Sequence, residues 1–134
     1  MRERVFVDSA AYYAYADTDD TNHAAALFAA RKLATSQADL FTTNFVVVET
    51  YTLLLNRIGR DIAREVLDRI DAGTTRVVRA TEADERRARE ILRQYSDKDY
   101  SMIDAISFAV MERLHLRLVW TYDAHFTQFG FVQI

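Results

Sequence analysis

The segment 4–17, RVFVDSAAYYAYAD, contains the pattern that decides the fold. Its apolar run, Val5 to Val7, shows no polar alternation, which is typical of a strand covered on both faces of a sheet. Asp8 follows at once and is the only charged residue between Val5 and Ala16. A short, largely apolar helix is expected next. A buried strand that passes through a lone carboxylate into a helix favours an α/β fold.

The same alternation of buried strands and helices continues through the rest of the chain. We predict strands over 4–8, 39–43, 75–81, 116–123 and 131–134, and helices over 9–16, 22–34, 45–58, 61–72, 81–95 and 101–115. Thr81 and Ser101 stand where capping residues open two of these helices. Such alternation predicts a three-layer fold in which helices flank a mainly parallel central sheet of about five strands. Because 134 residues contain no linker or repeat, we expect a single domain over 1–134.

Half of the residues are hydrophobic, and the chain has no cysteine and a formal net charge of −3. This composition argues against disorder and excludes disulfides, thiolate zinc sites and cysteine nucleophiles. The longest apolar run, 45–48, is too short to span a membrane, and 1–8 lacks the apolar run of a signal peptide. We therefore expect a soluble cytoplasmic protein without membrane association. Nucleic acid would need a local basic patch, for which Arg57, Arg60 and Lys98 are the candidates.

Asp8 is one of four acids that each stand in an otherwise uncharged stretch; the others are Glu49, Asp104 and Asp123. We expect Asp8 and Asp123 to end parallel strands, whose carboxyl ends meet at one edge of the sheet, where open α/β folds bind ligands. Asp104 falls in the first turn of its helix, and Glu49 falls in the second turn of the helix after the second strand. We therefore predict that all four carboxylates reach one cleft.

Four carboxylates in one cleft cannot all remain ionised without a positive counter-charge. Two of them about 5 Å apart repel by roughly 3 kcal/mol at an effective dielectric constant of about 20. Oxygen ligands without a thiolate or an organised histidine pair suit Mg²⁺ or Mn²⁺. Such an ion binds phosphates and activates water, so the pattern predicts phosphodiester hydrolysis, with these four acids as the metal-binding and catalytic residues. The glycines are too far apart for a dinucleotide or P-loop site, so no other cofactor is expected.

Each acid also has a structural interpretation. Asp8 and Asp123 can cap the helices that follow them, and Asp104 can complete a capping box with Ser101. Glu49 lies too deep in its helix to act as a cap, and its helical neighbours are mainly apolar. Taken together with the resemblance described below, the four acids favour a metal site over four independent structural roles.

Four segments carry a resemblance to a known family: VFVDSAAYYA (5–14), TTNFVVVETYTLL (42–54), YSMIDAISFAVMERL (100–114) and VWTYDAHFTQFGF (119–131). In this order and spacing they resemble the PIN-domain ribonucleases, specifically the VapC-like toxins of type II toxin–antitoxin pairs. The resemblance covers essentially the whole chain. It implies a PIN-like parallel sheet flanked by helices, an endoribonuclease that depends on Mg²⁺ or Mn²⁺, a homodimer, and inhibition by a small cognate antitoxin.

The resemblance also assigns individual acids. It places the family's metal-site acids on Asp8, Glu49, Asp104 and Asp123. In the mechanism that this implies, the three aspartates hold one ion, and the glutamate orients the attacking water or helps to hold a second ion. Asp99 matches a further acid that is common in these toxins, and Asp97 competes with it for that role.

Four polar residues near these acids complete the candidate site. Thr121 matches a hydroxyl position near the last acid. Asn44 and Ser101 are candidates to orient carboxylates, and helix capping explains both equally well. His125 stands where many relatives carry an acid or a small polar residue, and we expect it to cover the site rather than to touch the substrate.

Other functional classes account for the pattern less well. A non-enzymatic PIN-like scaffold that binds RNA or protein is the main alternative, but a scaffold would be expected to have lost some of the acids. A structure-specific DNA nuclease usually needs extra helices to grip a duplex, for which this chain has no room. A phosphoacceptor receiver domain would need a pair of acids after its first strand, where this sequence has only Asp8.

Overall fold

The computed structural model describes residues 2–134. Its strands form a sheet in the order β3-β2-β1-β4-β5, in which every neighbouring pair is parallel. The strands are β1 (Arg4–Val7), β2 (Asp39–Thr43), β3 (Arg76–Val78), β4 (Leu118–Trp120) and β5 (Val132–Gln133). The helices are α1 (Ser9–Ala16), α2 (His23–Thr35), α3 (Asn44–Arg57), α4 (Arg60–Ala72), α5 (Glu82–Gln94), α6 (Met102–Arg113) and α7 (Ala124–Phe129). The predicted fold class is confirmed. No helix within residues 2–134 is long and apolar enough to cross a membrane.

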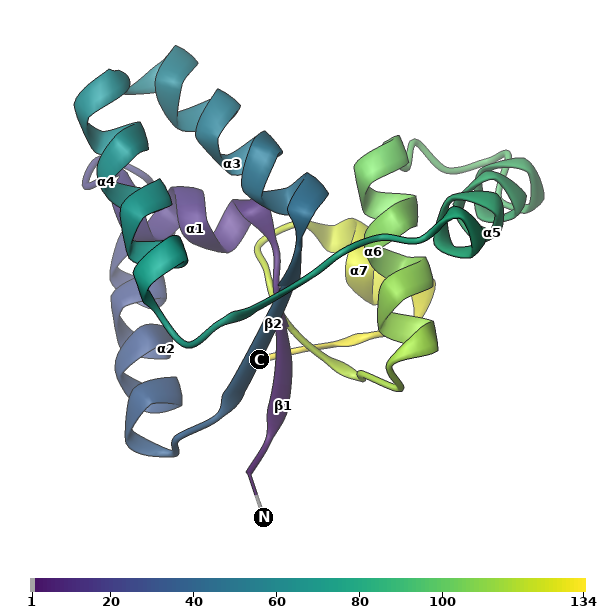
Figure 1. Cartoon of the computed structure of the whole chain (residues 1–134), viewed down its shortest axis with the longest axis horizontal. Helices are drawn as coiled ribbons and strands as arrows, with labels where there is room; N and C mark the ends of the chain where they lie inside the picture. Colours follow the sequence, from purple (N-terminus) through teal and green to yellow (C-terminus); the bar gives the residue numbers. More distant parts are fainter. Residues whose placement is uncertain (1) are drawn as a thin grey trace.

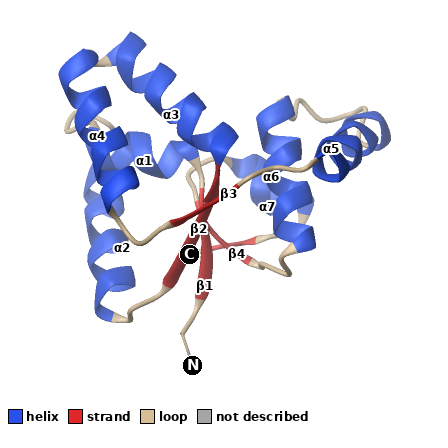
Figure 2. Ribbon diagram, viewed as in Figure 1, coloured by secondary structure: helices blue, strands red, loops and turns tan. Residues whose placement is uncertain are grey.

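Helices cover both faces of the sheet. Helices α1, α2 and α4 lie on one side and α5, α6 and α7 on the other, while α3 leads away from the end of β2 (Figure 1). Figure 2 shows the strands, in red, between these two groups of helices. Because side chains alternate along a strand, β1 serves both layers. Phe6 packs with side chains of α5, α6 and α7, whereas Val5 and Val7 pack with α1 and α2, and all three are buried as predicted.

The strand order places β1 at the centre of the sheet. The chain runs outward from β1 through β2 to β3, and then returns to the other side of β1 with β4 and β5. This change of direction opens a crevice at the carboxyl ends of β1 and β4, which is where open α/β sheets bind ligands. The backbone N–H of Asp8 donates to the carbonyl of Trp120 at 3.1 Å, so the residue that follows β1 is fixed to the end of β4.

Four of the five strands are shorter than the sequence predicts, and the differences at β3 and β4 are the largest. Strand β4 ends at Trp120, so Asp123 lies three residues beyond the strand and not at its end, and its position depends on the connection to α7. Strand β3 ends at Val78, because the chain then leaves the sheet and the backbone N–H of Ala80 donates to Asn44 Oδ1 at 3.0 Å. After β4 the backbone N–H of Asp123 likewise donates to a side-chain oxygen, Thr121 Oγ1. In both places a side-chain oxygen takes the place of a strand partner.

The core under α6 is built from aromatic rings. Phe108 of α6 is fully buried, and its ring centroid lies 5.1 Å from that of Tyr100, 5.0 Å from that of Phe126 and 4.6 Å from that of Phe129. Aromatic pairs at such distances contribute more than their buried area alone. Because α6 also carries Asp104, this aromatic cluster fixes the helix that brings Asp104 to the edge of the sheet.

Phe108→Ala should therefore lower the free energy of unfolding by about 3–5 kcal/mol, because it removes a buried ring and leaves a cavity among the remaining ones. Urea titration followed by circular dichroism measures the change. Phe28→Ala is the matched control: its ring is 71% exposed, and the variant should differ from the wild type by no more than about 0.5 kcal/mol. Equal losses in the two variants would contradict the assignment of Phe108 to the core.

Candidate active site

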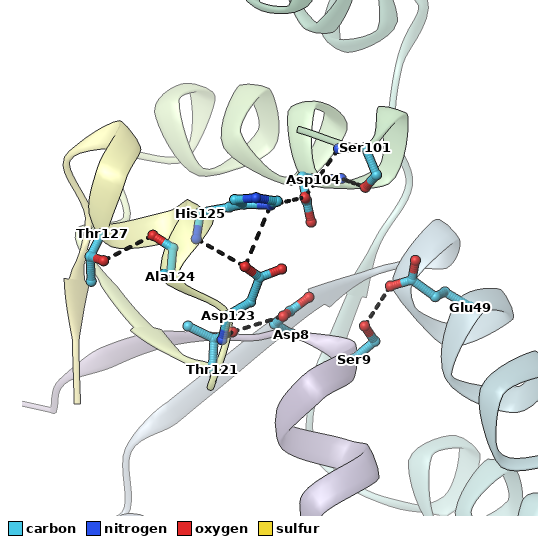
Figure 3. Close-up of polar contacts among 10 residues, drawn as sticks. All are labelled: Asp8, Ser9, Glu49, Ser101, Asp104, Thr121, Asp123, Ala124, His125 and Thr127. Carbon is cyan, nitrogen blue, oxygen red and sulfur yellow. Dashed lines mark hydrogen bonds and ion pairs between the residues drawn. The ribbon is translucent and has the colours of Figure 1, made fainter. Parts of the chain in front are cut away.

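The structure brings the four predicted acids together. Asp8, Glu49, Asp104 and Asp123 line one cavity of about 460 Å³. They come from four parts of the chain: the residue after β1, the second turn of α3, the first turn of α6, and the residue before α7. Figure 3 shows these carboxylates around a common space, with α1 and α3 on one side and α6 and α7 on the other.

Asp8 is the most buried of the four, with 3% of its surface exposed. It occupies the N-cap position of α1, yet its side chain makes no capping hydrogen bond, so the structural role considered for Asp8 is wrong. Its Oδ2 instead accepts a hydrogen bond from Thr121 Oγ1 at 2.8 Å. Burial raises the pKa of Asp8 to about 7, although the Thr121 hydroxyl opposes this rise and the charges of Asp104 and Glu49 reinforce it.

Asp104 has a structural role and a place in the cavity at the same time. The predicted capping box is present: the backbone N–H of Asp104 donates to Ser101 Oγ at 3.0 Å, and that of Ser101 donates to Asp104 Oδ2 at 3.2 Å. The same Oδ2 lies 2.9 Å from Nδ1 of His125. The capping box therefore fixes the carboxylate in the first turn of α6 and does not remove it from the cavity.

Asp123 is positioned by the turn after β4. Its backbone N–H donates to Thr121 Oγ1 at 3.0 Å, and its Oδ1 accepts from the backbone N–H of His125 at 2.9 Å, which caps α7. Because the Thr121 hydroxyl accepts this bond and donates to Asp8, a single side chain sets the relative positions of two of the acids. Thr121 itself is fully buried.

Glu49 is half-buried and is held from the opposite side of the cavity. Helix α3 begins where Thr43 Oγ1 accepts from the backbone N–H of Val46 at 3.1 Å, and Glu49 follows one turn later. The hydroxyl of Ser9, the first residue of α1, donates to Glu49 Oε1. Burial raises the pKa of Glu49, the Ser9 bond opposes the rise, and nearby carboxylates add to it.

The four carboxylates share one pattern. In each, one oxygen accepts a hydrogen bond from a protein donor: Asp8 Oδ2, Glu49 Oε1, Asp104 Oδ2 and Asp123 Oδ1. Within residues 2–134 the second oxygen of Glu49, Asp104 and Asp123 accepts no hydrogen bond, whereas Asp8 also interacts with the backbone N–H of Ser9. Carboxylates oriented in this way by outer donors are typical of sites for hard divalent cations. The donor set therefore fits a hard divalent cation.

The secondary candidates divide into two groups. Thr121 and Ser101 hold the acids as described, and Asp99 lines the cavity. Asp97 is absent from the residues of the described chain that line it, and it pairs with Lys98 at 3.6 Å instead. Asn44 is not joined to a carboxylate either, because its Oδ1 accepts the bond from Ala80. The N-cap of α3 is Thr43 and not Asn44.

His125 lies in the site, where the sequence led us to expect only a covering residue. Its Nδ1 is 2.9 Å from Asp104 Oδ2 and 3.4 Å from Asp123 Oδ1, and the bond to Asp104 raises its pKa. Ligand atoms of His125, Asp104 and Asp123 all lie within 4.8 Å of one another. The spacing of His125 two residues after Asp123 was the available signal. Ser9 is a second residue that sequence reasoning missed, and its only signal was its place beside Asp8.

Fold and site together define an α/β domain with a carboxylate cluster of the kind that binds divalent metal ions. Comparison with known families gives the particular one: residues 5–132 match the model of the PIN domain. The chain therefore belongs to the PIN domain family.

Relatives within the family include VapC proteins. The chain is 32% identical, over 130 residues that cover 97% of both proteins, to the 23S rRNA-specific endonuclease VapC20 of Mycobacterium tuberculosis strain H37Rv. It is 28% identical over 125 residues to ribonuclease VapC26 of the same strain, covering 92% of this chain and 90% of that protein.

Solved structures show the same relationship. The crystal structure of M. tuberculosis VapC20, described as a Sarcin-Ricin loop cleaving toxin, superposes with a TM-score of 0.88 at 30% identity, covering 97% of this chain and 98% of that one. The structure of FitAcB from Neisseria gonorrhoeae has a TM-score of 0.66 at 13% identity over 97% of this chain and 96% of that one, and supports the fold alone.

Burial of Asp8 predicts a specific dependence of stability on pH in metal-free buffer. The pKa of Asp8 is about 7 in the folded state and 3.8 ordinarily, so the native protein binds this proton more tightly than the unfolded chain does. As the pH rises from 3.8 to about 7, ionisation of Asp8 therefore lowers the free energy of unfolding. Asp8→Asn removes the buried charge. The variant should therefore gain stability over the wild type as the pH rises from about 5 to about 8, measured by urea denaturation in EDTA. A difference that does not change with pH would contradict this account, and the exposed Asp68→Asn is the control.

Proposed function

We propose that this chain is a metal-dependent endoribonuclease that hydrolyses RNA phosphodiester bonds, and that it is the toxin of a type II toxin–antitoxin pair. The observation that carries the proposal is the convergence of four carboxylates on one cavity, each oriented by a hydrogen bond from a protein donor. Membership of the PIN domain family and the naming of two VapC relatives as an endonuclease and a ribonuclease support it.

In this proposal Asp8, Asp104 and Asp123 would hold a Mg²⁺ or Mn²⁺ ion through the oxygens that face the cavity. Such an ion supplies charge neutralisation at a phosphate and lowers the pKa of a bound water. It also accounts for the clustering of acids, because a divalent charge offsets the burial, and the weaker mutual repulsion, that raise the pKa of Asp8 and Glu49.

The side chains around the acids have separate tasks in this proposal. Glu49 orients the attacking water, and burial, which raises its pKa, makes it a better proton acceptor than an exposed glutamate. Thr121 keeps Asp8 and Asp123 at a fixed separation, and His125 holds Asp104. Hydrolysis would leave a 5′-phosphate and a 3′-hydroxyl on the two RNA products.

Substrate and partners are proposed from the relatives. The 23S rRNA named for VapC20 makes ribosomal RNA the first substrate to test. Because the relative of known structure is described as a toxin, we propose that a small antitoxin binds this chain and blocks the cavity. We also propose that the chain is one PIN domain that forms a homodimer in the cytoplasm.

Asp104→Asn should reduce RNA cleavage by at least about 100-fold, since loss of even an outer partner of a metal site costs about 10- to 100-fold. Asparagine keeps an oxygen that can accept from Ser101, so the fold should be retained, as circular dichroism would show. Asp68→Asn removes an exposed carboxylate of α4 and should leave the rate unchanged. Cleavage of 23S rRNA in Mn²⁺ measures the rates, and full activity of Asp104→Asn would refute the assignment.

Binding of Mn²⁺ to the folded protein should raise its melting temperature by several degrees. A ligand at 100 times its dissociation constant contributes about 2.7 kcal/mol. Differential scanning fluorimetry in EDTA and in millimolar Mn²⁺ measures the shift, which Asp8→Asn combined with Asp104→Asn should abolish. A wild-type protein that shows neither the shift nor cleavage would favour the non-enzymatic scaffold instead.

A further inference from the structure

The acidic cavity has a positive corner at the end of α3. Six carboxylates line it: Asp8, Asp20, Glu49, Asp99, Asp104 and Asp123. Within residues 2–134, Arg57 is the one lysine or arginine among the lining residues. Lys98 and Arg60, which the sequence offered as further RNA contacts, are not among them. A cavity lined by carboxylates repels a negatively charged strand. A polyanion that enters it must therefore be attracted by Arg57 or by a bound cation.

The geometry of α3 connects Arg57 to the acids. Glu49, Leu53 and Arg57 are spaced four residues apart, which places them along one face of the helix, and all three line the cavity. Eight residues of α-helix advance about 12 Å, so the Cα atoms of Glu49 and Arg57 lie about that far apart along α3. The cavity thus runs from the carboxylate cluster along this face to the guanidinium.

Arg57 rests on an aromatic ring that is itself held in place. Its guanidinium carbon lies 5.2 Å from the ring centroid of Tyr13 in α1. The Tyr13 hydroxyl donates to Asp17 Oδ2 at 2.7 Å, and Asp17 Oδ1 accepts from the backbone N–H of Asp19 at 3.0 Å. A guanidinium has five N–H donors, so its contact with Tyr13 leaves donors that match the oxygens of a phosphate.

Some arginines of this protein are neutralised by an acidic partner, and others are not. Arg69, Arg87 and Arg113 each form an ion pair with a glutamate or aspartate at 2.9–3.0 Å. In the part of the chain that the structure describes, Arg57 forms no ion pair, although six carboxylates line the same cavity. Its charge is therefore available to a ligand.

We propose that Arg57, supported by Tyr13, is a phosphate-binding subsite for the RNA strand. Its Cα lies about 12 Å from that of Glu49, just over two helical turns along α3, so Arg57 contacts a phosphate that neighbours the scissile one and not the scissile phosphate itself. This inference rests on the proposed ribonuclease function, which it extends by giving the strand a second point of attachment. The contact is to the backbone, so it fixes the register of the strand without reading its sequence.

The test measures RNA binding apart from cleavage. Asp8→Asn serves as the inactive background, and fluorescence anisotropy follows a labelled single-stranded RNA oligonucleotide in buffer that contains Mg²⁺. Adding Arg57→Ala should weaken binding about 10-fold and should lower the slope of log affinity against log salt by about 0.7. Arg57→Lys should restore the salt slope but only part of the affinity. Arg89→Ala, which removes an exposed charge from α5, is the matched control and should change neither quantity.

A second measurement uses the active protein with and without Arg57→Ala. Loss of a backbone contact remote from the reacting atoms should raise KM with little change in kcat. If Arg57→Ala lowers the melting temperature but leaves RNA affinity and KM unchanged, Arg57 only joins α1 to α3, and the subsite is refuted. If the wild-type chain neither cleaves nor binds RNA, the proposed function is refuted and the subsite with it.

Discussion

The site depends on Asp8, a carboxylate that the strand order buries where its ionised form is poorly solvated. Asp8 follows the central strand of a parallel sheet, where neighbouring strands and helices on both faces remove it from water. Burial opposes its ionisation and raises its pKa to about 7. Without a counter-charge, Asp8 would be protonated or the carboxylates would repel one another. The arrangement is therefore favourable only when a cation or a proton is present. The remaining acids, brought to the same edge, make this requirement stronger.

Structural and functional roles of these acids are not alternatives in this fold. Asp104 completes a capping box and Asp123 caps α7, yet both line the cavity. A carboxylate has two oxygens, and the cap engages one while the other faces the cavity. Local hydrogen bonding thereby sets the direction of each ligand oxygen before any ion binds, which is how outer partners tune metal sites. Helix capping thus supplies part of the pre-organisation of the site.

The cavity divides into two regions of opposite charge. Carboxylates gather at the carboxyl ends of β1 and β4, and Arg57 lies further along α3 on the ring of Tyr13. A metal ion among the acids would turn the first region from repulsive to attractive for phosphate, whereas the second is attractive without metal. Such a division suits a negatively charged strand that must be both held and cut. It also makes strand binding depend on the same ion as the chemistry.

The sequence determined which residues are buried, where the helices begin, and which acids lack a local partner, because these properties depend on neighbours a few residues away. From these local properties, together with the family resemblance, we could predict the class of sheet, the capping boxes and the cluster of Asp8, Glu49, Asp104 and Asp123. Only the tertiary structure decided which donors from distant parts of the chain hold the acids. The Thr121 bond to Asp8 spans 113 residues, the Ser9 bond to Glu49 spans 40, and that of His125 to Asp104 spans 21. Such contacts arise from the packing of separate elements, which no local pattern encodes.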